Sequence, residues 1–116
     1  NKFATQYKEY STKAEYMKEE VVQAVLRRSK GLCEVCHSPK MVQLHHIVGG
    51  NGKRKQHEHK YSVIALCSDC NHGTYGVHGR EGKELDLKLK LELQKKYFSM
   101  GYTEEEVRKM MGGKLY

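Results

Sequence analysis

Hydrophobic residues recur every three to four positions near the start of the chain, which is the spacing of one face of an α-helix. The recurring positions are Met17, Val21, Val22, Val25 and Leu26. Thr12, followed three residues later by Glu15, has the form of a capping box. Gly31 suits the position just after a helix end. The pattern therefore predicts a helical segment within residues 1–30 that starts near Thr12.

Five leucines alternate strictly with polar residues from Leu85 to Leu93, a pattern that by itself indicates a β-strand. We predict a helix instead, because leucine is not branched at Cβ and the residues between, apart from Asp86, favour helices. One side of this helix would carry Leu85, Leu89 and Leu93, and another would carry Leu87, Leu91 and Phe98. The second side needs a partner, either the last helix or another subunit in a homodimer. Thr103 and Glu106 form a second capping box, which predicts that last helix.

Between the helical segments, residues 42–48 and 61–66 form short apolar runs that are typical of strands. A chain of 116 residues suits a single domain with a small core. We therefore expect an α+β fold with one domain over residues 1–116. Its parts would be an N-terminal helical segment (1–30), a compact centre (31–82) and a C-terminal helical segment (83–116).

The chain is basic, with 21 Lys and Arg against 14 Asp and Glu and a formal net charge of +7. Such a balance attracts a polyanion, most simply a nucleic acid. No apolar run approaches the roughly 20 residues that a membrane-spanning helix needs, so no membrane role is expected. The sequence begins with neither a signal-peptide nor a transit-peptide pattern, so we expect a cytoplasmic, reducing location.

The cysteines form two pairs with two residues between the thiols, Cys33 with Cys36 and Cys67 with Cys70, and 30 residues separate the pairs. Each spacing lets one tight turn aim two sulfur atoms at one cation, and two such turns complete the tetrahedral four-thiolate set of Zn²⁺. Two disulfides are the alternative, but the paired spacing and the lack of an export signal favour zinc. We predict one structural zinc ion with no open position for chemistry.

Two adjacent histidines, His45 and His46, interrupt the first apolar run. An unpaired imidazole in such a strand costs free energy, so we expect these residues to have a task. The loop that follows is rich in basic residues, which suit contacts with phosphates. These residues are Lys53, Arg54, Lys55 and Lys60.

Together these features resemble the zinc-knuckle HNH endonucleases over about residues 27–80. The two cysteine pairs and the run Leu44-His45-His46-Ile47-Val48 between them carry the resemblance. Members of that family, including phage-type enzymes, share a zinc-stapled ββα-metal fold and cut DNA. The resemblance implies such a core here, flanked by N-terminal and C-terminal helices, with DNA as the partner.

The resemblance also implies roles for individual residues. His46 would be the general base that deprotonates the attacking water, and His45 would be a ligand of a catalytic divalent cation. Asn71, directly after the last cysteine, would be a second ligand, as in phage-type members. An imidazole and an amide oxygen leave positions for water and phosphate, which suits Mg²⁺ or Mn²⁺.

Other positions are assigned by the resemblance only as alternatives. His72 or His78 would complete the metal site, and His78 or Arg80 would reach the scissile phosphate. Either Asn51 or Ser62 takes the place of an asparagine that ties the loop together in family members. The path of the chain after the last cysteine decides among His72, His78 and Arg80, and the spacing of the residues does not give that path.

We therefore expect a metal-dependent DNA endonuclease that hydrolyses phosphodiester bonds with a histidine base and one divalent cation. Two alternatives stay open. One is a non-catalytic, zinc-stabilised nucleic-acid-binding module, and the other is a protein-interaction domain of the zinc-ribbon kind. DNA cutting separates the first function from the second, and salt-dependent DNA binding separates both from the third.

Overall fold

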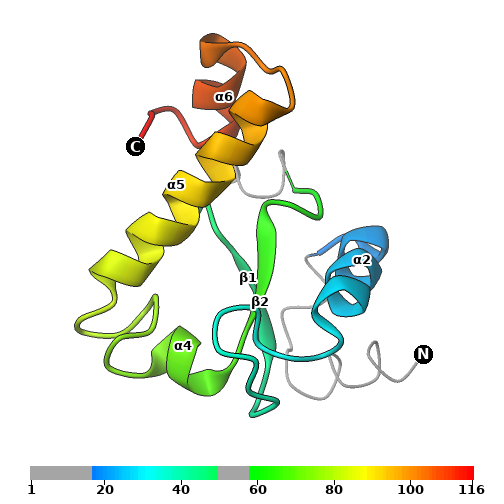
Figure 1. Ribbon diagram of the computed structural model, residues 1–116, viewed down its shortest axis with the longest axis vertical. Helices are drawn as coiled ribbons and strands as arrows, with labels where there is room; N and C mark the ends of the chain where they lie inside the picture. Colours follow the sequence, from blue (N-terminus) through cyan, green and yellow to red (C-terminus); the bar gives the residue numbers. More distant parts are fainter. Residues whose placement is uncertain (1–16, 50–57) are drawn as a thin grey trace.

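The computed structural model describes residues 17–49 and 58–116. In this part of the chain, four helices and one two-stranded sheet follow one another along the sequence. In order, they are α2 (Glu19–Ser29), β1 (Gln43–His46), β2 (Val63–Leu66), α4 (Ser68–His72), α5 (Lys83–Ser99) and α6 (Glu104–Met110) (Figure 1). The predicted α+β class is confirmed. None of the described helices combines the length and the apolar character that crossing a membrane requires.

The two strands lie in the middle of the molecule, with α2 on one side and α5 on the other (Figure 1). β1 and β2 run antiparallel, in the register that pairs His45 with Ile64. Because side chains alternate along a strand, Leu44 and His46 point to one face of the sheet, and Gln43 and His45 point to the other. The two predicted site histidines therefore face different sets of neighbours.

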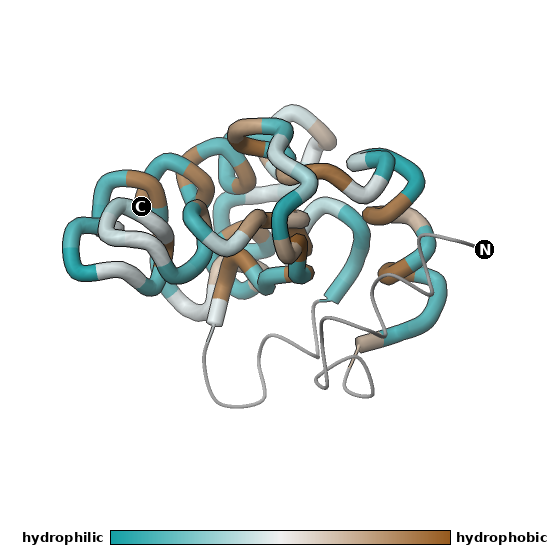
Figure 2. Tube along the Cα trace, turned by 90° about the horizontal axis from the view of Figure 1, so that it is seen from below, coloured by the Kyte–Doolittle hydropathy of each residue, from teal (hydrophilic) through white to brown (hydrophobic). Residues whose placement is uncertain are grey.

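Two hydrophobic clusters hold the helices to the strands. The first joins α2 to one face of the sheet and includes the buried residues Cys33 and Cys67. The second joins α5 and α6 to Ile47 and Val48, which follow β1. Ile64 packs against both clusters, so the sheet connects them. Hydrophobic and hydrophilic residues alternate along the helical turns, as expected of helices that bury one side (Figure 2).

α2 confirms the predicted apolar stripe but not the predicted start of the helix. The stripe is buried at Val21, Val22, Val25 and Leu26. The helix begins at Glu19, and the preceding Lys18 is extended, with its N–H donated to the Glu58 carboxylate. One unbroken helix from Thr12 is therefore wrong, and Thr12 itself lies outside the described residues. The predicted stop is confirmed, since Gly31 follows the helix with a φ angle of 77°.

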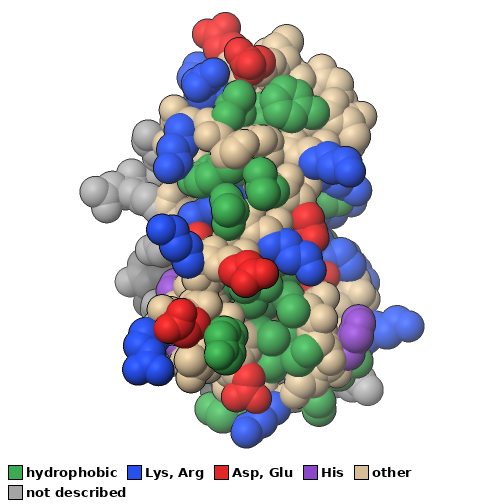
Figure 3. All heavy atoms as spheres, turned by 60° about the vertical axis from the view of Figure 1, so that its left-hand side comes forward, with side chains coloured by type: hydrophobic (Ala, Val, Ile, Leu, Met, Phe, Trp, Pro, Cys, Tyr) green, Lys and Arg blue, Asp and Glu red, His purple; other side chains and the backbone are tan. Residues whose placement is uncertain are grey.

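The alternating leucines lie in α5, so the predicted helix is confirmed and the strand is excluded. One side of α5 is buried in the second cluster through Leu89, Leu93 and Tyr97. The other predicted side is exposed at Leu87, Leu91 and Phe98. On the face that carries α5, exposed hydrophobic side chains lie among Lys, Arg, Asp and Glu (Figure 3). A homodimer through this side stays a prediction.

The capping box that precedes α6 is also confirmed. The Thr103 hydroxyl accepts the Glu106 N–H at 3.2 Å, and the Glu106 carboxylate accepts the Thr103 N–H at 2.9 Å. These hydrogen bonds lower the pKa of Glu106. The cap starts a helix whose Val107 is fully buried against α5.

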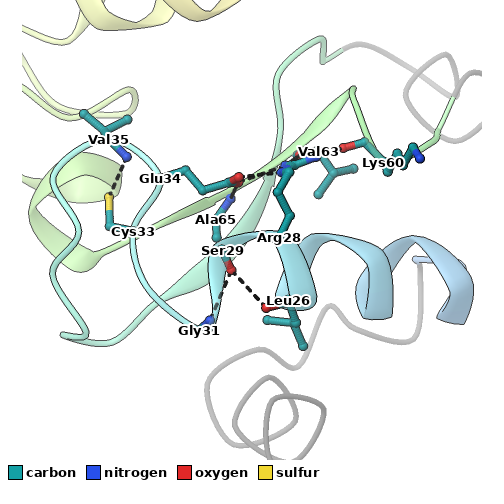
Figure 4. Close-up of polar contacts among 10 residues, drawn as sticks. All are labelled: Leu26, Arg28, Ser29, Gly31, Cys33, Glu34, Val35, Lys60, Val63 and Ala65. Carbon is teal, nitrogen blue, oxygen red and sulfur yellow. Dashed lines mark hydrogen bonds and ion pairs between the residues drawn. The ribbon is translucent and has the colours of Figure 1, made fainter.

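Arg28 and Glu34 close the outer edge of β2 (Figure 4). The Arg28 guanidinium pairs with the Glu34 carboxylate through Nε (2.5 Å) and Nη2 (2.9 Å). It also donates to the carbonyl oxygens of Lys60 and Val63. Glu34 in turn accepts the Ala65 N–H at 2.8 Å. A sheet edge otherwise leaves backbone N–H and carbonyl groups unpaired. This ion pair supplies hydrogen-bond partners for those groups of β2 and ties α2 to the strand.

We expect Arg28→Ala to lower the free energy of unfolding by about 2–3 kcal/mol. The substitution removes the guanidinium from the Glu34 carboxylate and from the carbonyl oxygens of Lys60 and Val63. Arg27→Ala, in the same helical turn, removes an exposed side chain and should change stability by less than about 0.5 kcal/mol. Urea unfolding in the presence of Zn²⁺ measures both variants. Equal effects would show that the edge network contributes no more than an exposed arginine does.

Candidate active site and metal centre

The four cysteine thiols are brought together by the turn after α2 and by the first turn of α4, which carries Cys67 as its N-cap and Cys70. Their sulfur atoms all lie within 4.8 Å of one another, close enough to hold one metal ion. The Sγ atoms of Cys36 and Cys67 lie 3.5 Å apart, well beyond a disulfide bond, and all four cysteines are free. The predicted convergence of the four thiols is confirmed.

Backbone N–H groups point at the sulfur atoms in both turns. The Val35 N–H donates to Cys33 at 3.4 Å, and the Cys70 N–H donates to Cys67 at 3.5 Å. Burial raises the pKa of Cys33, but hydrogen bonds from the backbone outweigh it and lower that pKa to about 7. The pKa of Cys70 is raised by burial and by the neighbouring thiols. A bound cation would balance the negative charge of the thiolates and so favour their deprotonated form.

His45 and Asn71 carry the two buried side-chain polar atoms that have no hydrogen-bond partner in the described part of the chain. These atoms are His45 Nε2 and Asn71 Oδ1. The Asn71 amide donates through Nδ2 to Oε1 of Gln43 at 3.3 Å, and Gln43 shares a face of β1 with His45. Both unpaired atoms therefore belong to the same side of the sheet. Buried polar atoms are normally paired, so these two unpaired atoms are candidates for binding a ligand.

The chemistry of this pair fits a divalent cation. Burial, with a smaller contribution from His78, lowers the pKa of His45 to about 4. The imidazole is therefore neutral at physiological pH and can offer a lone pair to a metal. The Asn71 oxygen is a hard donor of the kind that Mg²⁺ and Mn²⁺ accept.

A glycine-rich coil follows α4 and packs back against it. Three N–H groups, spaced three residues apart, each donate to the carbonyl of the preceding glycine in the series Gly73, Gly76, Gly79 and Gly82. A Cβ atom on Gly79 would lie 1.8 Å from the carbonyl oxygen of Gly73, so no larger residue fits. The His78 N–H donates to the Asn71 carbonyl at 2.9 Å. The coil thereby places His78 beside the candidate ligands.

The coil decides which histidine adjoins His45. The helix does not continue across this segment, because α4 ends at His72 and the chain then becomes extended at Gly73. The ring of His78 stands edge-on to His45, with the centroids 5.1 Å apart. The ring of His72 stacks on His78 at 5.6 Å. His78 thus contacts His45, whereas His72 joins the group through His78.

His46 has a different neighbour, the carboxylate of Glu58. His46 Nε2 lies 2.5 Å from Glu58 Oε2. The Glu58 side chain is 0% exposed, and its other oxygen accepts the Lys18 N–H at 2.7 Å. The alternation of the strand sends His45 and His46 to opposite faces, so the structure places them in separate side-chain groups.

The predicted DNA-binding residues are only partly described. Lys53, Arg54 and Lys55 lie outside the described residues, and so does Asn51, the alternative to Ser62 for the loop asparagine. Lys60 and Arg80 are both exposed. The buried Ser62 hydroxyl donates to the His59 carbonyl and accepts the His59 N–H, each at 3.0 Å. Ser62 therefore ties the turn before β2, the task that the resemblance gives to the loop asparagine.

A hollow of about 610 Å³ lies between α4, the glycine-rich coil and the start of α5. None of the predicted catalytic histidines lines it, nor does Asn71. Its lining includes three acidic residues, Asp69, Glu81 and Glu84. Their negative charge does not suit a phosphate, so the hollow is not part of the candidate site.

Sequence reasoning missed two residues that contact the candidate site. Glu58 is the one acid among residues 53–60, which are otherwise basic or neutral. That isolated acid, twelve residues after His46, was the available signal. Gln43 shares the period-two face of His45, which could have identified it as a neighbour.

The resemblance to the HNH endonucleases is carried by the motif residues and stays a hypothesis. Comparison of the chain with family models, with curated proteins and with solved structures finds no match in any of the three.

Proposed function

We propose that this protein is a metal-dependent DNA endonuclease of the HNH type, built on a zinc-stapled ββα core. His46 would act as the general base, and His45 and Asn71 would hold a divalent cation, Mg²⁺ or Mn²⁺. The observation that carries the proposal is the pair of unpartnered buried atoms, His45 Nε2 and Asn71 Oδ1. The motif selects the same two residues as cation ligands, and their unpaired state is an independent reason to choose them.

The side chains of this site would have separate roles in phosphodiester hydrolysis. A bound cation would neutralise charge on a phosphate oxygen and on the 3′ leaving oxygen. His46 would take a proton from water, whose oxygen bonds to phosphorus while the bond from phosphorus to the 3′ oxygen breaks. The leaving oxygen then takes a proton from solvent. Gln43 accepts the Asn71 amide N–H, which leaves the Asn71 oxygen free for the cation.

His78 is the neighbour best placed to complete this site. Its exposed imidazole adjoins His45, and its backbone N–H is bonded to Asn71. We assign it either to the cation or to the scissile phosphate. His72 is the weaker candidate, because it reaches the group through His78.

The four-thiol cluster would hold one structural Zn²⁺. That ion would fix the turn before α4 and with it the position of Asn71, which directly follows the last cysteine. The net charge of +7, the exposed Lys60 and Arg80 and the basic loop at 53–55 would bind DNA phosphates. Zinc-bound thiolates persist in a reducing compartment, which agrees with the expected cytoplasmic location.

Plasmid nicking tests the proposal. We expect zinc-loaded protein to convert supercoiled DNA to nicked or linear forms when Mg²⁺ or Mn²⁺ is added. The control omits the added cation rather than using a chelator, because a chelator would also remove zinc. The rate should fall as salt concentration rises, since phosphate contacts release counterions.

DNA binding without cutting under all these conditions would support the non-catalytic binding module instead. One observation favours that alternative. In residues 17–49 and 58–116, the four thiols are the one group of three or more His, Cys, Asp or Glu side chains placed to hold an ion. Absence of both binding and cutting would contradict both functions and would favour a protein-interaction domain.

A further inference from the structure

We propose that Glu58 is the positioning residue of His46 and fixes its imidazole in the tautomer that presents Nδ1 as the base. The inference rests on the proposed endonuclease function and deepens it. Glu58 lies outside the motif residues, and only the folded chain brings it to His46.

The Glu58 carboxylate is held between two donors from distant parts of the chain. Oε2 lies 2.5 Å from His46 Nε2, and Oε1 accepts the Lys18 N–H at 2.7 Å. The whole side chain is shielded from water, with 0% exposure. A carboxylate with a backbone donor on one oxygen cannot turn away from His46 without losing that bond. The contact is therefore a fixed one.

The hydrogen-bond chemistry of this contact selects one tautomer. An ionised carboxylate can only accept, so the hydrogen between the two groups belongs to His46 Nε2. A neutral imidazole carries one N–H, which leaves the lone pair on Nδ1. The His46 side chain keeps 14% exposure, so part of the ring remains reachable. Nδ1 is thus the atom that would take the proton from water.

A purely structural role is the competing explanation. Glu58 also joins the start of α2 to the end of β1, and that junction would contribute to stability without any catalytic effect. The two explanations differ in what they require. A junction needs only a side chain of the same shape that forms both hydrogen bonds, whereas a positioning role needs a group that accepts from Nε2.

Glu58→Gln separates the two roles. Glutamine has the same shape, and its carbonyl oxygen can accept the Lys18 N–H while its NH₂ group donates to His46 Nε2. The imidazole must then carry its hydrogen on Nδ1, which removes the lone pair from the proposed base atom. We expect kcat for nicking to fall about 100-fold or more with little change in KM, and the melting temperature to stay close to that of the wild type. Glu92→Gln, on the exposed part of α5, is the matched control and should change neither.

NMR of ¹⁵N-labelled histidine gives a readout that does not depend on DNA cutting. At neutral pH we expect the wild type to show a protonated Nε2 and an unprotonated Nδ1 at His46, and Glu58→Gln to show the reverse. A mixture of tautomers in the wild type, or an Nδ1–H form, would overturn the proposal even if the variant does not fold. A reversed tautomer with unchanged kcat would also overturn it. If the wild type binds but never cuts DNA, the proposed function fails, and the NMR spectrum still decides whether Glu58 fixes the tautomer.

Discussion

Cys67→Ser is expected to leave the protein without a cooperatively folded state, even with excess Zn²⁺. Cys67 is 1% exposed, and its sulfur is one of the four that converge. It also accepts the Cys70 N–H at the start of α4 and lies in the first hydrophobic cluster. Structural zinc contributes on the order of 10 kcal/mol or more in small domains, which is comparable with the whole stability of an ordinary protein. Loss of a structural zinc ion would therefore outweigh the hydrophobic contacts that remain.

Circular dichroism and amide NMR dispersion measure this effect, with thermal melting followed in zinc-loaded and chelator-treated samples. Removal of the metal from the wild type should give the same result as the substitution. Ser68→Ala, at the neighbouring half-buried position, is the matched control and should melt as the wild type does. A Cys67→Ser protein that melts cooperatively at the wild-type temperature would show that the thiol cluster does not hold the fold.

His46→Ala is expected to lower the nicking rate by about 10²–10⁴-fold while DNA affinity stays close to that of the wild type. The imidazole would act only on the proton of the attacking water, so its loss affects the chemical step rather than binding. Single-turnover nicking with Mn²⁺ and a parallel binding assay measure the two properties separately.

Because His46→Ala leaves the buried Glu58 without a partner, His46→Asn is the second variant to test. Its amide can still donate to Glu58, but it cannot act as a base. His37→Asn replaces an exposed histidine in the first cysteine turn, and asparagine tolerates the φ angle of 66° there. This control should cut at the wild-type rate. A folded His46→Asn protein that also cuts at that rate would exclude His46 as the base.

The features that the sequence predicts correctly depend on residues close together in the chain. The cysteine spacing predicts the convergence of the four thiols because each turn sets the positions of two of them. Helical propensity correctly predicts that the alternating leucines of α5 form a helix, since residues that favour strands are absent from that run. The Thr103 capping box involves residues only three apart.

The contacts that the sequence does not predict join distant segments. Glu58 bonds to Lys18 across 40 positions, and Arg28 bonds to the Lys60 carbonyl across 32 positions. Neither contact is marked by a periodic pattern in the sequence, because each depends on how α2 packs on the sheet. Arg28 lies in the last turn of α2, but its side chain pairs with Glu34 and the Val63 carbonyl at the edge of β2.

The central claim is that His45 and Asn71 share a divalent cation apart from the four-thiol ion. Crystals of zinc-loaded protein soaked in Mn²⁺, with anomalous data collected on both sides of the manganese absorption edge, test it most directly. We expect a manganese peak about 2.2 Å from both His45 Nε2 and Asn71 Oδ1, and a separate zinc peak among the sulfur atoms. A zinc peak with no manganese at those two atoms, under saturating Mn²⁺, would contradict the claim.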